Sequence, residues 1–349
     1  MKENKTKFNI AKIGRDNYPF IIAEIGQAHD GSLGMAHSYI DAAYKAGANA
    51  IKFQTHIASE ESTYDEPFRV KFSFQDKTRY DYWKRMEFTE DEWKGLADHA
   101  EEIGLVFLSS PFSLKAIDIL SKIGVNIWKI GSGETESSEM LNKMISLNGL
   151  IILSSGMSNW DEISKSVNYL KENSADFVLL QCTSMYPTPI ESVGLNILEE
   201  MKNNFACPVG LSDHSGSIFP SLAALARGVD VLELHITFDK SMFGPDTSSS
   251  LNLEEFKLVC DARDNFYKMA INPVDKNKMS KSLEKLRATF RKSIAPKASL
   301  KAGDVINKDM LTVKKPATGI PPDELENIIG KKLKNNVSKN HVLKWEDIE

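Results

Sequence analysis

Two short apolar runs decide how this chain folds: Val209-Gly210-Leu211-Ser212-Asp213-His214 and Val231-Leu232-Glu233-Leu234-His235-Ile236-Thr237. Each run is rich in Val and Leu and is bounded by turn or helix signals, which predicts a buried strand. Between them, residues 218–226 have the apolar spacing of a crossover helix. A strand, a helix and a parallel strand place both strand ends at the same edge of a sheet. We therefore expect His214 and His235 to lie side by side.

The same pattern extends over most of the chain, because eight apolar runs alternate with stretches of helical periodicity. The runs are residues 20–26, 50–55, 105–110, 127–132, 150–156, 177–184, 209–214 and 231–237. The helical stretches include residues 35–46, 90–103 and 160–170, and the last helix is expected at 253–269. Eight strands that alternate with helices predict an α/β fold of the TIM (β/α)8 barrel type. Residues 1–20 precede the first strand and are expected to form a small hairpin at the barrel floor.

The character of the sequence changes after the last of these helices. Residues 272–292 are Lys-rich and weakly apolar, which indicates a linker with a basic helix. From residue 291 onward, short strand-like pieces alternate with turns. We predict a barrel domain over 1–270, a linker over 271–290 and a small domain over 291–349. Because so short a module buries little apolar surface, we expect it to pack on another surface.

Composition argues against a nucleic-acid-binding, disulfide-rich or membrane protein. The 349 residues carry a net charge of −5, with 42% hydrophobic and 26% charged residues, as in ordinary soluble proteins. This charge gives no reason to expect a nucleic-acid partner. The three cysteines are far apart, which argues against a disulfide framework. No apolar stretch approaches the roughly 20 residues of a membrane helix, so we expect a cytoplasmic protein without a membrane partner.

Polar side chains gather at the carboxyl ends of the expected strands. They are Glu24, Lys52, Gln54, Ser109, Ser110, Lys129, Ser132, Ser154, Ser155, Gln181, Thr183, Ser184, Ser212, Asp213, His214, Glu233 and His235. In a barrel these ends meet at the catalytic mouth. Ser and Thr also occur where a chain turns, but a turn does not require Lys or Glu inside a strand. The connection 56–88 is unusually long and aromatic, and it suits either a lid over this mouth or a packing arm between subunits.

The residue types at the mouth indicate an anion pocket beside a metal site. Lys52 and Lys129 supply charge, and the serines supply directed donors for a phosphate or carboxylate. The alternative is that either lysine forms a Schiff base, which would require an apolar environment. His214 and His235 suit a divalent metal that polarises a carbonyl, although one histidine at a strand end is usually structural.

Carboxylates complete the expected site. Glu24, Asp213 and Glu233 would position hydroxyl groups or manage an attacking water, which makes them the candidate catalytic residues. The remaining histidines are interpreted as surface, loop or helix residues, with only His29 near the mouth. They are His29, His37, His56, His99 and His341.

Eight ordered motifs resemble those of the sialic acid synthase family, the phosphoenolpyruvate-dependent nonulosonate synthases. They are Ile22-Ala23-Glu24-Ile25-Gly26, Lys52-Phe53-Gln54, Lys129-Ile130-Gly131-Ser132-Gly133-Glu134, Ser154-Ser155-Gly156-Met157, Gln181-Cys182-Thr183-Ser184-Met185-Tyr186-Pro187, Gly210-Leu211-Ser212-Asp213-His214, Glu233-Leu234-His235-Ile236-Thr237 and Gly244-Pro245-Asp246. The likeness continues into an antifreeze-like (SAF) domain from about residue 291.

The resemblance implies a reaction and a ligand for each group. Phosphoenolpyruvate would be bound by Lys52, Lys129, Ser132, Ser154, Ser184 and Ser212. A divalent ion, typically Mn²⁺ or Mg²⁺, would lie on His214 and His235 and polarise the aldehyde of an open-chain N-acylated amino sugar. C3 of phosphoenolpyruvate would attack this aldehyde, water would add at C2, and phosphate would leave by C–O cleavage. Sugar hydroxyls would be held by Glu24, Gln54, Tyr186 and Asp246.

In this family the SAF domain of one subunit caps the site of its partner, which implies a domain-swapped homodimer. Lys315 stands where relatives carry an arginine that meets the N-acyl group, and lysine cannot make the same planar contact. Ala28, Ser184 and Leu234 also depart from the usual Asn, Asn and Arg. The acceptor therefore stays open between N-acetylmannosamine and the diacetylated 6-deoxyhexose precursors of legionaminic and pseudaminic acids. Less favoured alternatives are a 3-deoxyoctulosonate or heptulosonate phosphate synthase and a non-catalytic glycan-binding or ice-binding protein.

Overall fold

The computed structural model describes residue 13 and residues 18–70, 72–135 and 137–349. The chain divides into two units, Met1–Ile271 and Asn272–Glu349. Most of the hairpin expected within residues 1–20 lies outside the described residues. Within those residues, no helix has the length and apolar character needed to cross a membrane.

The described part of the first unit contains a closed parallel barrel made of strands β1 to β8. These are β1 (Phe20–Gly26), β2 (Ala50–Thr55), β3 (Val106–Pro111), β4 (Ile127–Ile130), β5 (Leu150–Ser154), β6 (Phe177–Cys182), β7 (Val209–Asp213) and β8 (Val231–Thr237). Neighbours in sequence pair in order, and β8 pairs back onto β1 to close the sheet. The short strand β9 (Leu251–Asn252) pairs parallel with the end of β8. The predicted TIM barrel is confirmed.

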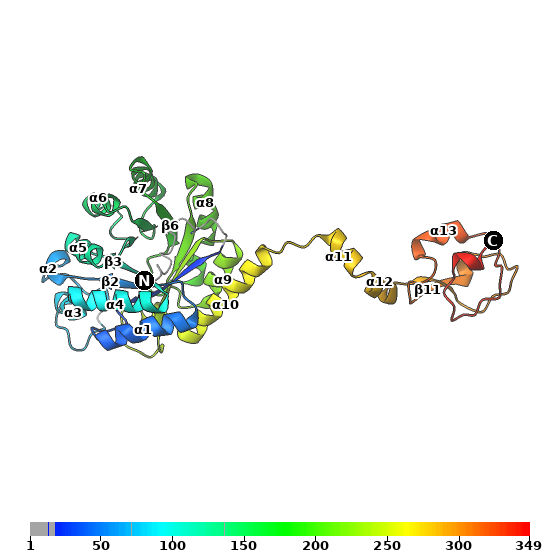
Figure 1. Ribbon diagram of the computed structural model, residues 1–349, viewed down its shortest axis with the longest axis horizontal. Coiled ribbons are helices and arrows are strands. Elements are labelled where there is room, and N and C mark those ends of the chain that lie inside the picture. Colours follow the sequence, from blue (N-terminus) through cyan, green and yellow to red (C-terminus); the bar gives the residue numbers. More distant parts are fainter. Residues whose placement is uncertain (1–12, 14–17, 71, 136) are drawn as a thin grey trace, which may run out of the picture. The chain divides into compact units, whose positions relative to one another are not determined.

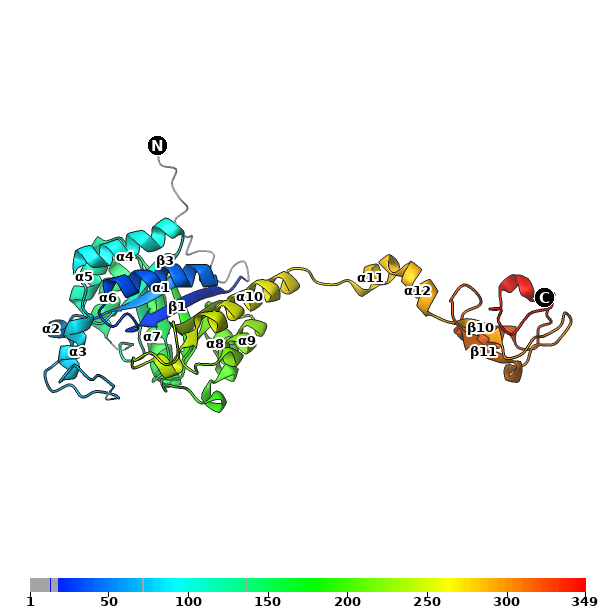
Figure 2. The ribbon, with the colours of Figure 1, turned by 90° about the horizontal axis from the view of Figure 1, so that it is seen from below.

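Helices cover the outside of this barrel (Figure 1). They are α1 (Leu33–Ala46), α4 (Glu90–Ile103), α5 (Leu114–Lys122), α6 (Ser138–Ser146), α7 (Trp160–Glu172), α8 (Leu195–Phe205), α9 (Ile218–Ala226) and α10 (Leu253–Ala270), with 3-10 turns η2 (Ile190–Ser192) and η3 (Thr247–Ser249). Figure 2 shows α1 and α4 as neighbours on this outer layer. Capping boxes at Thr89 and Asn159 start α4 and α7, because each side chain accepts a backbone N–H that the helix leaves free.

The interior of the barrel is apolar at one end and polar at the other. The apolar cluster at the amino ends of the strands includes Ile22, Ala50, Leu108, Ile152 and Val231. Because alternate side chains of a strand point to the same face, the residue two positions further along also points inward. These inward residues are Glu24, Lys52, Ser110, Ser154 and Glu233. The two-residue period of the strands thus places the polar side chains towards the carboxyl ends of the strands, next to an apolar layer at their amino ends.

The long connection between β2 and α4 folds into two short helices and its own small core. The helices are α2 (Ala58–Glu61) and α3 (Arg79–Met86). The core contains Ala58, Tyr82, Trp83 and Met86, with Phe68, Phe72 and Tyr80 packed against it. The segment is therefore an ordered structure with apolar contacts of its own.

The second unit has a separate hydrophobic core. Its elements are α11 (Lys276–Ser282), α12 (Glu284–Phe290), β10 (Ser293–Pro296), β11 (Leu311–Lys314), α13 (Leu325–Ile328) and the 3-10 turns η4 (Lys308–Met310), η5 (Pro322–Glu324) and η6 (Trp345–Asp347). Strands β10 and β11 pair antiparallel. The core is formed by Ile294, Ile306, Leu311, Ile320, Ile328, Leu333, Val337, Leu343 and Ile348. Lys315 follows β11 in this unit.

Candidate active site

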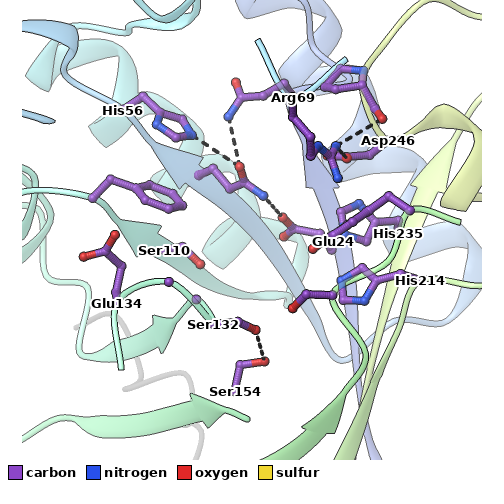
Figure 3. Close-up of a pocket in the computed structure, with 18 of the residues that line it drawn as sticks. Glu24, His56, Arg69, Ser110, Ser132, Glu134, Ser154, His214, His235 and Asp246 are labelled. Atoms are coloured by element: carbon purple, nitrogen blue, oxygen red, sulfur yellow. Dashed lines mark hydrogen bonds and ion pairs between the residues drawn. The ribbon is translucent and has the colours of Figure 1, made fainter. Parts of the chain in front are cut away.

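A cavity of about 450 Å³ lies at the carboxyl ends of the barrel strands (Figure 3). Each barrel strand contributes at least one lining residue. Thirteen of the candidate site residues line it: Glu24, Lys52, Gln54, Lys129, Ser132, Ser154, Ser184, Tyr186, Ser212, His214, Glu233, His235 and Asp246. The structure therefore brings together side chains that are spread over more than 220 positions of sequence.

Two lysines and two carboxylates form a buried charged group at the base of the cavity. Lys52 Nζ lies 2.9 Å from Glu24 Oε2 and 3.6 Å from Glu233 Oε1. Lys129 Nζ approaches the same Glu233 oxygen at 3.5 Å. Strand register creates this group, because Glu24 of β1 pairs with Lys52 of β2, and Ser212 of β7 pairs with Glu233 of β8.

Both signs of charge persist in this group despite burial. Burial alone would lower the pKa of Lys52, but Glu233 and Glu24 raise it above its usual value. Burial would raise the pKa of Glu233, but Lys129 and Lys52 hold it below its usual range. A lysine kept protonated is a poor nucleophile, so this environment favours anion binding by Lys52 over Schiff-base chemistry.

A cluster of small polar side chains forms the adjoining wall. Ser132 Oγ lies 3.4 Å from Ser154 Oγ and 3.8 Å from Cys182 Sγ. Gly156 packs so closely that a Cβ there would collide with the hydroxyls of Ser132 and Ser184. The absence of a side chain at Gly156 therefore allows these hydroxyls to gather within reach of an anion.

The two histidines lie together, as their strand ends predict. The ring centroids of His214 and His235 are 5.1 Å apart, and the ring of Tyr186 lies 4.4 Å from that of His214. Burial lowers the pKa of His214 well below its ordinary value, and His235, Lys129 and Lys52 lower it further. A neutral imidazole has a free lone pair, which is the form that binds a metal.

His214 and His235 are two nitrogen donors that could hold a metal ion. Among the described residues, no group of three or more His, Cys, Asp or Glu side chains is arranged to hold an ion. An ion held by these two imidazoles alone would take its other ligands from water or from a substrate oxygen. Glu233 Oε2 is buried without a hydrogen-bond partner in the same cavity, which supplies a further oxygen donor nearby. Nitrogen ligands suit Mn²⁺ better than Mg²⁺, which prefers oxygen alone.

Asp213 and Lys315 are placed differently from the other candidates. The Asp213 carboxylate accepts hydrogen bonds from Ser215 N at 2.9 Å and from the hydroxyls of Ser215 and Ser221. It is not among the residues that line the cavity, because it lies on the opposite phase of β7 from Ser212. Asp213 therefore braces the turn between β7 and α9. Lys315 belongs to the second unit, where its Nζ lies 5.0 Å from the ring centroid of Phe290.

The interpretation of His56 was wrong. His56 was read as remote from the mouth, but it lines the cavity, whereas His29 does not. His29 is fully buried with its ring centroid 4.8 Å from that of Phe88, and burial lowers its pKa to about 3. The sequence did contain a signal, because His56 directly follows β2 just as His214 directly follows β7.

The long connection supplies cavity residues that the sequence did not single out. Arg69 Nη2 lies 2.7 Å from Asp246 Oδ1, and its guanidinium lies 4.2 Å from the ring centroid of Tyr186. Arg79 lies 3.3 Å from Glu66 and stacks on Trp83. This segment therefore forms one wall of the cavity.

Glu134 also lines the cavity, from the loop after β4. Burial raises its pKa, and Glu61 raises it further. A raised pKa makes a carboxylate a stronger base than an exposed one.

Comparison with known proteins identifies matches along nearly the whole chain. Residues 39–274 match the NeuB family, and residues 291–349 match the SAF domain. N,N'-diacetyllegionaminic acid synthase of Campylobacter jejuni is 36% identical over 330 residues, which cover 93% of this chain and 98% of that protein. N-acetylneuraminate-9-phosphate synthase of Homo sapiens is 33% identical over 343 residues, which cover 97% of this chain and 94% of that protein.

A solved structure also matches. The crystal structure of N-acetylneuraminic acid synthetase from Leptospira borgpetersenii has a TM-score of 0.67 at 28% sequence identity. The match covers 78% of this chain and 93% of that chain.

Proposed function

The chain belongs to the NeuB family of synthases, and on that premise we propose that it condenses phosphoenolpyruvate with an open-chain N-acylated hexosamine. The products would be a nonulosonic acid and inorganic phosphate. One observation carries this proposal: a single cavity holds the amines of Lys52 and Lys129 together with the paired imidazoles of His214 and His235. An anionic enol donor and a carbonyl acceptor each require one of these groups.

The lysine side of the cavity suits phosphoenolpyruvate. Two buried amines supply charge for its phosphate and carboxylate, and hydroxyl groups supply directed donors. We assign these donors to Ser132, Ser154, Ser184 and Ser212. Glu233 lies between the amines at 3.6 and 3.5 Å, so its role would be to hold both in place until the donor binds.

The histidine side suits the acceptor. A divalent ion held by His214 and His235 would act as a Lewis acid on the aldehyde oxygen. Gln54, Tyr186 and Asp246 would bind sugar hydroxyls, and Glu24 fixes Gln54 because its Oε1 accepts from Gln54 Nε2 at 2.7 Å. C3 of the donor then attacks the aldehyde carbon, water adds at C2, and the C–O bond to phosphate breaks. Glu134 is suited to accept the proton of that water.

The charges around the acceptor side favour a sugar without a phosphate group. Arg69 and Arg79 line the cavity, and each lies against a carboxylate, of Asp246 and Glu66 respectively. A guanidinium that is already neutralised offers little to a second anion. This supports N-acetylmannosamine or a diacetylated 6-deoxyhexose over the phosphorylated acceptor of a 3-deoxyoctulosonate-type synthase.

A homodimer in which residues 291–349 of one subunit cap the other subunit's cavity is part of this proposal. Exposed apolar side chains near the cavity support a partner there. Val70 and Met157 line it with 54% and 65% exposure, and Phe74, 87% exposed, contacts Phe243. Large apolar exposure around a polar site is typical of a surface that another chain covers. Lys315 would then reach the acceptor, and because phosphoenolpyruvate is a cytoplasmic metabolite, the reaction would occur in the cytoplasm.

Phosphate release tests this proposal directly. The chain is incubated with phosphoenolpyruvate, Mn²⁺ and, in separate reactions, N-acetylmannosamine and the legionaminate and pseudaminate precursors. We expect release with at least one sugar, and none when the sugar or the metal is omitted. Release without sugar, or no release with any of the three, would contradict the proposal.

A further inference from the structure

His56 has an unusual environment for a histidine in the cavity wall. Its ring lies between the rings of Trp83 and Phe112, with centroid distances of 3.8 and 4.2 Å and interplanar angles of 15° and 11°. Only 5% of the residue is exposed. Its Nδ1 lies 2.6 Å from Glu61 Oε1, and its Nε2 lies 3.3 Å from Gln54 Oε1.

The orientation of the Gln54 amide is fixed by its other neighbours. Its nitrogen donates to Glu24 Oε1 at 2.7 Å, and the second oxygen of Glu24 is paired with the Lys52 amine. Reversing the amide would place two oxygens against each other. Gln27 Nε2 also donates to Gln54 Oε1 at 3.2 Å, in agreement with this orientation. The side of Gln54 that faces His56 is therefore an acceptor.

This orientation dictates where protons lie on His56. Nε2 must carry a hydrogen in order to donate to Gln54 Oε1. In a neutral imidazole, Nδ1 would then present a bare lone pair to the carboxylate of Glu61 at 2.6 Å, which is repulsive. A second proton between Nδ1 and Oε1 removes the repulsion. The flanking aromatic faces also favour a positively charged ring.

We propose that a proton held between His56 and Glu61 makes this pair a positioning element for Gln54, and through Gln54 for the acceptor sugar. The role of Gln54 toward the sugar rests on the proposed function, whereas the proton does not. Neither side chain needs to touch the substrate. Their effect would be to keep the Gln54 amide in one orientation while the acceptor binds.

Nuclear magnetic resonance of the protein labelled with ¹⁵N-histidine tests the proton without any substrate. The His56 signals are assigned by their loss in His56→Phe. At neutral pH we expect Nε2 to carry a hydrogen and Nδ1 to share one with Glu61. A neutral ring with hydrogen on Nδ1 alone would overturn the inference.

Steady-state kinetics test the positioning role. His56→Phe keeps an aromatic ring in the stack but removes both nitrogens, so circular dichroism should report an unchanged fold. We expect the KM for the acceptor to rise about tenfold, the worth of one hydrogen bond, with little change in the KM for phosphoenolpyruvate. Glu61→Gln should raise the acceptor KM by less, because its amide can donate to Nδ1 while Nε2–H still donates to Gln54.

These measurements separate the inference from the proposed function. If the wild type releases phosphate and His56→Phe leaves the acceptor KM unchanged, the positioning role is wrong and the function stands. Equal increases in both KM values would also overturn the role. If no sugar supports turnover but the shared proton is observed, the proposed function fails while the paired proton stands.

Discussion

The two sides of the cavity are built in different ways. On the lysine side, Lys52, Lys129 and Glu233 lie within barrel strands, where the ladder fixes each backbone and the two-residue period fixes each direction. On the sugar side, Gln54 and His235 also lie in strands, but Arg69 and Asp246 lie in connections that their ion pair joins. The positions of side chains in strands are therefore fixed and can be predicted from the sequence. The positions of side chains in connections depend on how those connections pack. The comparison predicts that changes to side chains at the strand ends affect turnover most, and that changes to side chains in the connections affect acceptor choice.

The largest effect is expected at the imidazole pair. His214→Ala or His235→Ala should lower metal-dependent kcat by at least about a hundredfold, because each removes a ligand from a site with few protein donors. Circular dichroism should show a folded barrel. Assays with the metal removed and then restored measure this change, and unchanged turnover in either variant would refute the role of that histidine as a ligand.

Lys52 is expected to give the next largest effect. Lys52→Ala should raise the KM for phosphoenolpyruvate about a hundredfold, which corresponds to the loss of charge-assisted hydrogen bonds, and should change the acceptor KM much less. The change removes an ion-pair partner from both Glu24 and Glu233, so the free energy of unfolding should fall by about 3 kcal/mol. Ligand titration and chemical denaturation measure the two effects. Equal changes in both KM values would mean that the donor side is misassigned.

The side chains within the strands could be predicted from the sequence for a physical reason. An apolar run of five to seven residues cannot change its register without exposing a buried face, so each run predicted both its strand and its inward set. Glu24, Lys52, Ser154 and Glu233 follow from that pattern alone. The same rule explains Asp213, which has the opposite phase from Ser212 and so turns away from the cavity. A strict reading of the period would have excluded Asp213 in advance.

The loop-borne side was harder to predict for an equally physical reason. None of the described residues between 56 and 88 belongs to a strand, so the position of Arg69 depends on how the aromatic cluster packs. Its contacts with Asp246 and Tyr186 join residues more than 110 positions away in sequence. His56 lies between these two cases. It directly follows β2, but the sequence analysis treated it as a surface, loop or helix residue. The first residue after a barrel strand is best treated as part of that strand end.

Arg69 tests whether a side chain in a connection affects only the acceptor sugar. Arg69→Ala should raise the acceptor KM about threefold to tenfold, because it frees Asp246 and uncovers Tyr186, while the KM for phosphoenolpyruvate changes little. The matched control is Arg79→Ala, which removes a second cavity-lining arginine of the same segment, one that contacts Glu66 and Trp83. If both variants change the two KM values alike, Arg69 acts through the stability of the segment and not through the acceptor side.

The smallest effect is expected in the second unit. Lys315→Arg should alter the acceptor KM by a few-fold at most, since the planar guanidinium adds directed donors without changing the charge. Sedimentation of the wild type provides the companion measurement. A fully active monomer would rule out the cap from a partner subunit. If Lys315→Arg changes only the KM for phosphoenolpyruvate, Lys315 contacts the donor and not the acceptor.

The central claim is that one cavity holds the metal and phosphoenolpyruvate at the same time. Paramagnetic relaxation of the ³¹P signal of phosphoenolpyruvate by Mn²⁺, recorded without sugar so that no turnover occurs, tests this most directly. We predict strong enhancement of relaxation in the wild type, and its loss in His214→Ala although phosphoenolpyruvate still binds. Binding of phosphoenolpyruvate with no enhancement by Mn²⁺, or equal enhancement in His214→Ala, would contradict the account.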